Sequence, residues 1–137
     1  MKEIKPLKQE RFTIVLAPIT KKNSQEIHLN KYTGKRWISP SPKYKEYEHA
    51  AAWYMPHIKT IKEPVNVQAV FYMPTRMRVD LVNLQEALLD VMVRYCVIAD
   101  DNSEIVCSMD GSRVEYDKQN PRTEVTITYL EEQEEPE

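Results

Sequence analysis

Glycine is scarce in this chain of 137 residues, which contains only Gly34 and Gly111. Dinucleotide-binding and P-loop folds hold phosphate with several closely spaced glycines. Two isolated glycines therefore exclude Rossmann enzymes, P-loop NTPases and protein kinases. Cysteine is equally scarce, because Cys96 and Cys107 are too few and too far apart for a zinc site or a CxxC redox motif. We predict that both are ordinary buried thiols.

Long apolar runs are also lacking. No stretch approaches the ~20 residues that span a membrane, and the first residues contain no apolar segment typical of a signal peptide. The sequence therefore predicts a cytoplasmic protein with no membrane segment. Its length suits one domain, which we expect over residues 1–130, followed by a solvated acidic tail over 131–137.

Charge is present in both signs but is unevenly distributed. The net charge is −2, yet residues 1–79 carry 15 Lys and Arg against 6 Asp and Glu, whereas residues 80–137 carry 4 against 15. A net charge near zero thus combines a basic first half with an acidic second half. The acidic tail explains only part of this difference.

Alternation and helical spacing predict an α+β fold, with a mixed sheet of about four to five strands and two helices packed on it. Strands are expected over residues 11–17, 65–73, 104–109, 112–116 and 123–129. Helices are expected to begin at Ser41-Pro42 and at Asp80. Residues 27–38 form either a short hairpin around Gly34 or a mobile loop. Asp110-Gly111 predicts a tight hairpin between the two strands that flank it.

The second helix, from Asp80 to about Tyr95, has two apolar stripes. One comprises the predicted core face, which consists of Leu81, Leu84, Leu88, Val91, Met92 and Tyr95. The other contains Val82, Leu89 and Val93. This second stripe is explained equally well by another layer of core and by a subunit interface.

Acidic and amide side chains are concentrated in two short segments. The first holds Asp80, Asn83, Glu86 and Asp90 at the start and on the polar face of the second helix, and the second is Ala99-Asp100-Asp101-Asn102. Hard cations such as Mg²⁺ bind oxygen ligands and retain water and substrate phosphate. Two such segments that converge would suit metal-assisted phosphodiester cleavage. Spacing alone favours the simpler explanations, which are a helix cap at Asp80, a solvated helix face and a turn at Asp100-Asp101-Asn102.

The region from residue 80 to 106 resembles the RusA family of Holliday-junction resolvases. Its members carry an Asp-x-Asp-Asn-Leu motif that opens a helix, and an Asp-Asp pair before a short strand. The matching residues are Asp80, Asn83, Leu84, Ala87, Asp90, Val97-Ile98, Asp100-Asp101 and Ile105-Val106. The segments 18–24 and 39–47 are similar to the family's basic loop and first helix start, so the resemblance covers roughly residues 11–130.

This resemblance implies a homodimeric endonuclease that cuts four-way DNA junctions symmetrically with Mg²⁺ or Mn²⁺, in recombination and repair. It implies Asp80 and Asp101 as metal ligands, Asp100 as a neighbouring ligand, and Asn83 as an orienting residue.

Two positions depart from the family pattern. Val82 stands where the family has its second aspartate, and Glu86 stands where it has a lysine. We expect Glu86 to supply the missing carboxylate, so that catalysis and metal binding involve Asp80, Glu86 and Asp101. The missing lysine would then be replaced by Lys21, Lys22 or Arg78. The alternatives are a catalytically silent junction-binding protein, and a structural protein whose two acidic segments lie far apart.

The basic first half would bind the DNA backbone, because each neutralised phosphate adds a salt-dependent increment of affinity. The candidate DNA-binding residues are Lys21, Lys22, Asn23, Lys31, Lys35, Arg36, Lys43, Arg76 and Arg78. Trp37 and Tyr32 are candidates for stacking on an unpaired base. Surface solubility and ordinary packing are the alternative explanations of these residues.

Overall fold

The computed structural model describes residues 6–21 and 25–131 of the chain. Within them it contains seven strands, two α-helices and one short 3-10 helix. The elements are β1 (Gln9–Ile14), β2 (Gln25–Leu29), β3 (Arg36–Pro40), α1 (Pro42–Ala51), η2 (Ala52–Tyr54), β4 (Val65–Met73), α2 (Leu81–Arg94), β5 (Val106–Ser108), β6 (Arg113–Tyr116) and β7 (Arg122–Tyr129).

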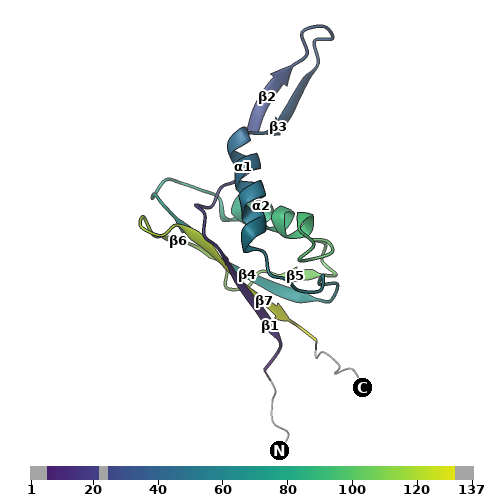
Figure 1. Ribbon diagram of the computed structural model, residues 1–137, viewed down its shortest axis with the longest axis vertical. Helices are drawn as coiled ribbons and strands as arrows, with labels where there is room; N and C mark the ends of the chain where they lie inside the picture. The colour runs from purple at the N-terminus through teal and green to yellow at the C-terminus, as the bar shows by residue number, and fades with distance from the viewer. Residues whose placement is uncertain (1–5, 22–24, 132–137) are drawn as a thin grey trace, which may run out of the picture.

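The main sheet has five strands and is mixed, with the order β1-β7-β4-β5 and with β6 also paired to β4. The central strand β4 pairs with β7 in the antiparallel direction, and β1 pairs with the other edge of β7. Both helices pack on one side of this sheet, and β2 and β3 form a separate hairpin that projects from the start of α1 (Figure 1). The predicted α+β class and the predicted number of strands are confirmed.

The predicted hairpin around Asp110-Gly111 is wrong. The turn exists, with Ser112 N donating to Met109 O at 3.2 Å, but β5 and β6 do not pair with each other. Instead, both run parallel to β4 and occupy successive stretches of the same edge. The side chain of Asn66 holds the turn against β4, because it accepts from Asp110 N at 2.8 Å and donates to Asp110 O at 3.2 Å.

The core lies between the sheet and the helices. From α2 it contains Leu84, Leu88, Val91 and Met92, which are at most 2% exposed, so most of the predicted core face is confirmed. In β7 the residues alternate regularly between buried and partly exposed positions. This alternation gives the sheet one apolar face toward the helices and one polar face toward solvent.

The second apolar stripe of α2 divides between the core and the surface. Leu89 and Val93 are partly buried against the core, whereas Val82 is 69% exposed.

The predicted burial of the two cysteines is wrong, since Cys96 and Cys107 are both exposed. Cys96 directly follows the C-cap of α2 and has a positive φ of 59°. Such a residue reverses the chain at a helix end, which explains its exposure.

Residues 27–38 form a hairpin rather than an irregular loop, because β2 and β3 pair in the antiparallel direction from residue 25 to 40. The helix that follows begins as predicted, with Ser41 as its N-cap and Oγ of Ser41 accepting from Tyr44 N at 3.2 Å.

No helix in the described part of the chain is long and apolar enough to cross a membrane. Apart from Glu131, the predicted acidic tail lies outside the described residues.

Candidate functional site

Asp80 occupies the N-cap position of α2, but its side chain makes no capping hydrogen bond. Instead, Asp80 Oδ2 accepts from Asn83 Nδ2 at 3.2 Å, so the amide of Asn83 orients this carboxylate. Asp80 is exposed and Asn83 is partly buried one turn further into the helix. The carboxylate is therefore accessible to solvent and is held by the side chain of Asn83. An ordinary N-cap carboxylate would instead accept a hydrogen bond from the backbone of the first helical turn.

Asp100 and Asp101 lie in a loop that the core fixes at its start. Ile98 is fully buried and forms a parallel bridge with Ile61, and Ala99 N donates to Ile61 O at 2.9 Å. Within the loop, Asp100 accepts from the backbone N of Asp101 at 2.7 Å and from Asn102 Nδ2 at 3.2 Å. Both oxygens of Asp100 thus accept hydrogen bonds within the loop, and Asp101 beside it is exposed.

The Asp101 carboxyl is electrostatically strained. Partial loss of water, a hydrogen bond with Asp100 and the negative charges of Asp100 and Asp90 together raise its pKa above the ordinary value. Asp90 belongs to the third turn of α2, so the helix and the loop bring their acids into electrostatic range of each other. A carboxyl whose pKa is shifted by desolvation and by neighbouring charge is a candidate for a functional role.

Lys21 brings positive charge to the same place. Its Nζ lies 3.5 Å from Asp90 Oδ2 and 5.9 Å from the centre of the Tyr44 ring. We call Lys21, Asp90, Asp100 and Asp101 the acidic cluster. The cluster thus combines three segments: α2, the loop after it, and the β1–β2 connection, which is far from the other two in sequence.

A polar hollow of about 470 Å³ lies beside Lys21, between α1 and the C-terminal end of α2. Its lining consists of Lys21, Tyr44, Lys45, Glu48, His49 and Arg94. Arg94 is paired with Glu48 at 2.7 Å. The hydroxyl of Tyr44 is buried and has no hydrogen-bond partner among the described residues, and burial raises the pKa of this tyrosine. Lysine and arginine side chains around such a hollow suit an anionic ligand such as phosphate.

The donor set fits a hard divalent cation in kind, since the predicted ligands are carboxylates. No group of three or more His, Cys, Asp or Glu side chains among residues 6–21 and 25–131 is arranged to hold a metal ion. A magnesium site does not require such a group, because one or two carboxylates with water and substrate phosphate suffice. The mutual repulsion at Asp101 is a charge imbalance that a bound cation would relieve.

The predicted basic residues lie in three places. Lys31, Lys35 and Arg36 are exposed on the β2–β3 hairpin. Lys21 and Lys43 lie near its base. Arg76 and Arg78 precede α2, where Arg76 stacks 4.3 Å from the centre of the Tyr116 ring. Lys22 and Asn23 lie outside the described residues.

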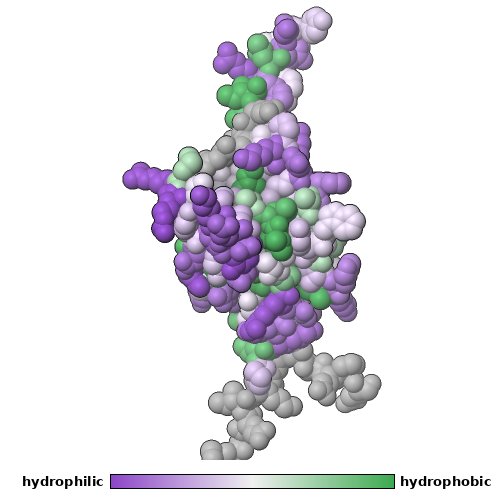
Figure 2. Space-filling model, turned by 60° about the vertical axis from the view of Figure 1, so that its left-hand side comes forward, coloured by the Kyte–Doolittle hydropathy of each residue, from purple (hydrophilic) through white to green (hydrophobic). Residues whose placement is uncertain are grey.

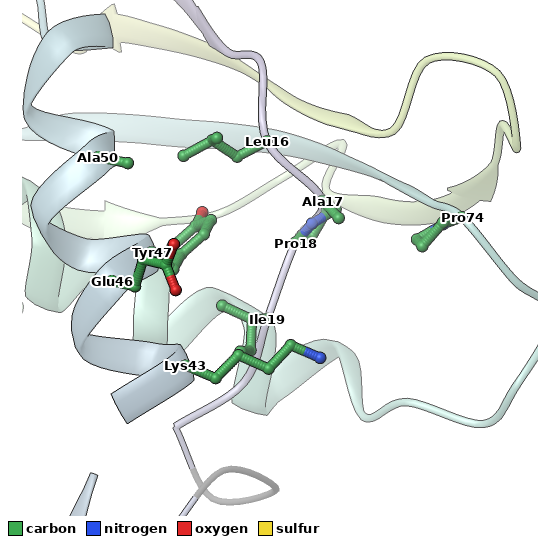
Figure 3. A pocket seen from close by; sticks show the side chains of 9 residues that line it. All are labelled: Leu16, Ala17, Pro18, Ile19, Lys43, Glu46, Tyr47, Ala50 and Pro74. Carbon is green, nitrogen blue, oxygen red and sulfur yellow. The ribbon is translucent and has the colours of Figure 1, made fainter. Parts of the chain in front are cut away.

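A second hollow, of about 320 Å³, has a mainly apolar lining (Figure 3). Leu16 and Ile19 from the segment after β1 and Tyr47 from α1 line it, with Lys43 and Glu46 at its edge on α1. Burial raises the pKa of Tyr47 to about 12. This lining lacks the paired carboxylates of the acidic cluster, so the cluster is the better candidate for phosphodiester chemistry.

Sequence reasoning placed Asp90 in the first acidic segment and in the family motif without assigning it a role at the site, and it gave Lys21 only as one of several basic candidates. Asp90 shares an arc of α2 with Asn83 and Glu86. Its partner Lys21 lies 69 positions away in a segment without regular structure, which no periodicity connects to a helix. The contributions of His49 and Arg94 to the polar hollow were missed for the same reason.

Comparison with curated proteins gives no match to this chain. Comparison with protein families gives a match to endodeoxyribonuclease RusA over residues 16–128, which include the acidic cluster, Asp80 and the projecting hairpin. The match covers most of the chain and accords with the resemblance seen around Asp80 and Asp100-Asp101. The chain belongs to the RusA family of endodeoxyribonucleases.

Proposed function

We propose that this protein is a metal-dependent endodeoxyribonuclease that resolves four-way DNA junctions by paired symmetric cuts. The observation that carries the proposal is the family match over residues 16–128, a range that includes Asp80, α2 and the loop with Asp100-Asp101. The polar hollow, which Lys21 lines, and the exposed basic residues of the hairpin provide surfaces for an anionic partner.

In this proposal Asp80, Asp101, Glu86 and Asp100 hold Mg²⁺, for which Mn²⁺ substitutes. When bound, the cation supplies an activated water and neutralises the charge that develops on the phosphodiester. Asn83 keeps the Asp80 carboxylate in place through its 3.2 Å hydrogen bond. Lys21, held near the cluster by Asp90, contributes the positive charge that the family's lysine would otherwise supply.

Glu86 is proposed to replace the aspartate that the family has at Val82. Positions 82 and 86 are four residues apart on α2, so their side chains are neighbours on the helix surface. Both positions are exposed. Glutamate has a longer side chain than aspartate. From one turn further into the helix, the carboxylate of Glu86 can therefore reach the space next to Asp80.

Cleavage of a synthetic four-way junction tests the proposal. Purified wild-type protein is expected to cut the junction with Mg²⁺ or Mn²⁺ and not with EDTA. Glu86→Gln is expected to abolish cutting while binding is retained, and Glu104→Gln serves as the matched loss of one exposed carboxylate. A protein that binds the junction but never cuts it, and is indifferent to Glu86→Gln, would instead be the catalytically silent alternative.

We also propose a homodimer, because two symmetric cuts are most simply made by two copies. Of the second apolar stripe on α2, only Val82 is well exposed, so it is the residue to test. Val82→Lys is expected to weaken the dimer in light scattering. An unaltered dimer would instead favour an interface formed by the last strands of the chain, where Val114 and Tyr116 of β6 are 38% and 40% exposed.

A further inference from the structure

The β2–β3 hairpin, which we call the arm (residues 25–40), is a sheet of its own. Figure 1 shows that it projects from the start of α1, away from the five-stranded sheet. A two-stranded ribbon without further packing is marginally stable in water. An element of this kind is retained when it serves contact with something outside the domain.

The turn of the arm is well defined and displays one aromatic ring. Asn30 Oδ1 accepts from Tyr32 N at 2.9 Å and from Thr33 N at 3.3 Å, and Gly34 reverses the chain with a φ of 73°. Gly34 N donates to Asn30 O at 2.8 Å, which closes the turn. Tyr32, at the tip, is 100% exposed.

Trp37 is also pre-positioned. Its ring stacks on His28 across the strand pair, with centroids 5.2 Å apart and planes 15° apart. His28 Nε2 and Ser39 Oγ are 2.6 Å apart, which fixes the imidazole in turn. Even so, Trp37 is 50% exposed, so one part of the indole is held rigid while another part is presented to solvent.

The other face of the arm is apolar as well. Ile27 and Ile38 are directly opposite each other in the register and are 75% and 62% exposed, and Leu29 is 54% exposed. Figure 2 shows hydrophobic side chains on the projecting part of the molecule, interspersed with hydrophilic ones. Exposed apolar side chains in this number on one small element indicate an interaction surface.

The charge of the arm selects the partner. Residues 25–40 contain three basic residues, Lys31, Lys35 and Arg36, against one acid, Glu26. A second copy of the arm would carry the same positive charge and be repelled. Nucleic acid offers both negative phosphates and flat apolar faces, and proteins bind single strands through basic grooves with stacking aromatics.

The base of the arm lies at the acidic cluster. Lys21, four residues before β2, pairs with Asp90, and Tyr44, four residues after β3, lies beneath Lys21. Strands of five residues extend about 15 Å. A nucleic acid strand held along the arm therefore arrives at the cluster within a few nucleotides.

We propose that the arm binds unpaired bases at the branch point of the DNA, with Trp37 and Tyr32 stacking on them. Lys31, Lys35 and Arg36 bind the adjoining phosphates. In an intact duplex the base faces are covered by neighbouring base pairs, so the arm distinguishes branched from linear DNA. This inference rests on the proposed function for the kind of DNA, but it concerns binding rather than cleavage.

The first test uses binding alone, with Asp101→Asn in all proteins so that no DNA is cut. A fluorescent four-way junction and a linear duplex of the same sequence are titrated and followed by anisotropy. Trp37→Ala is expected to weaken junction binding by about 5- to 150-fold, the effect of one lost stacking contact, and duplex binding by less than about twofold. Trp37→Phe should retain most of the affinity, which shows that the arm still folds.

The matched control is Trp53→Ala. Trp53 is 87% exposed but lies in η2, outside the arm. It is expected to change neither affinity. Equal loss on junction and duplex in Trp37→Ala, or no loss on either, would overturn the proposal.

A second measurement does not depend on cleavage or on junctions. The chain has two tryptophans, so Trp53→Phe leaves Trp37 as the only one. Its fluorescence is expected to be quenched by single-stranded oligonucleotide and by the junction, and not by duplex. Binding of the junction without quenching, or no binding of single strands, would overturn the proposal. A change of the Trp37 fluorescence with protein concentration in the absence of DNA would also overturn it, because that result would assign the arm to contact with a second copy. Failure of cutting with quenching intact would count against the proposed function alone.

Discussion

Two aspartates in loops of this protein have opposite electrostatic environments. Asp117, between β6 and β7, accepts from the backbone N of Asn120 at 3.0 Å and of Gln119 at 3.1 Å, and from Arg122 at 2.9 Å. These contacts lower its pKa, with the backbone hydrogen bond from Asn120 as the largest cause. At Asp101 partial loss of water, Asp100 and Asp90 raise the pKa instead.

The difference separates a structural carboxylate from a candidate functional one. Asp117 is surrounded by donors that the fold itself supplies, and its partner Arg122 also stacks 3.8 Å from the Tyr72 ring. Asp101 is placed where other acids oppose its charge, an arrangement that folding alone does not favour. Mutations at the two positions should therefore affect different properties.

The largest expected effect is on cleavage. Asp101→Asn should reduce junction cleavage by at least about 100-fold, because even residues that only support a metal ligand cost up to that factor when changed. Asp117→Asn should leave the cleavage rate unchanged. Single-turnover cleavage at saturating protein measures both, and equal rates for the two variants would remove the distinction between the two aspartates.

Lys21 should have the next largest effect. Lys21→Gln removes the cation that lies 3.5 Å from Asp90, and we expect cleavage to fall by about 10- to 100-fold. Lys21→Arg should restore most of the rate because it keeps the charge. Lys8→Gln is the matched control, since Lys8 pairs with Glu10 at 3.7 Å on β1 and is expected to have no effect.

Arg122 should affect stability and not cleavage. Arg122→Met removes the contacts with Asp117, Glu124 and the Tyr72 ring, and should lower the midpoint of thermal unfolding by about 2–5 °C. Arg113→Met, which removes an exposed pair with Glu115, should change it less. Differential scanning fluorimetry gives both values, and the reverse order would show that the Arg122 network is not structural.

The smallest effect is the dependence of stability on pH. A raised pKa means that folded Asp101 binds its proton more tightly than the unfolded chain does. Its contribution to stability is therefore complete below the ordinary aspartate pKa of about 3.9 and is lost as the pH rises through the raised value. Asp101→Asn should thus increase the free energy of unfolding at pH 7, by no more than about 1 kcal/mol for so exposed a group, and should have no effect near pH 3. Urea denaturation at the two pH values measures this, and a destabilised variant at pH 7 would contradict it.

Much of the fold follows from local sequence patterns. The helix that starts at Asp80, the cap at Ser41 and the alternation in β7 are all properties of neighbouring residues, and all are found as predicted. The pairing of β5 and β6 is not local. Asp110-Gly111 does make a turn, but the side chains of Asn66 and Gln68 on β4 decide where the chain goes next.

The candidate site was predictable to a similar extent. Asp80, Asn83, Asp100 and Asp101 are visible as a motif, and the structure describes Asp80 with Asn83 and Asp100 with Asp101 in contact. The association of Lys21 with Asp90, and of Asp90 with Asp101, is a tertiary contact. Tertiary packing decides such contacts, and no spacing in the sequence encodes them.

The position of β7 between β1 and β4 has a consequence for synthesis of the chain. The strand that joins the two halves of the sheet, Arg122–Tyr129, is close to the C-terminus, and it pairs with β1 and β4 along nearly its whole length. Until these residues emerge from the ribosome, β1 and β4 have no common neighbour, and the edge of β4 that pairs with β7 has no partner strand. The nascent chain therefore remains open, and a message that ends before residue 122 yields a polypeptide destined for aggregation or proteolysis rather than a smaller working domain.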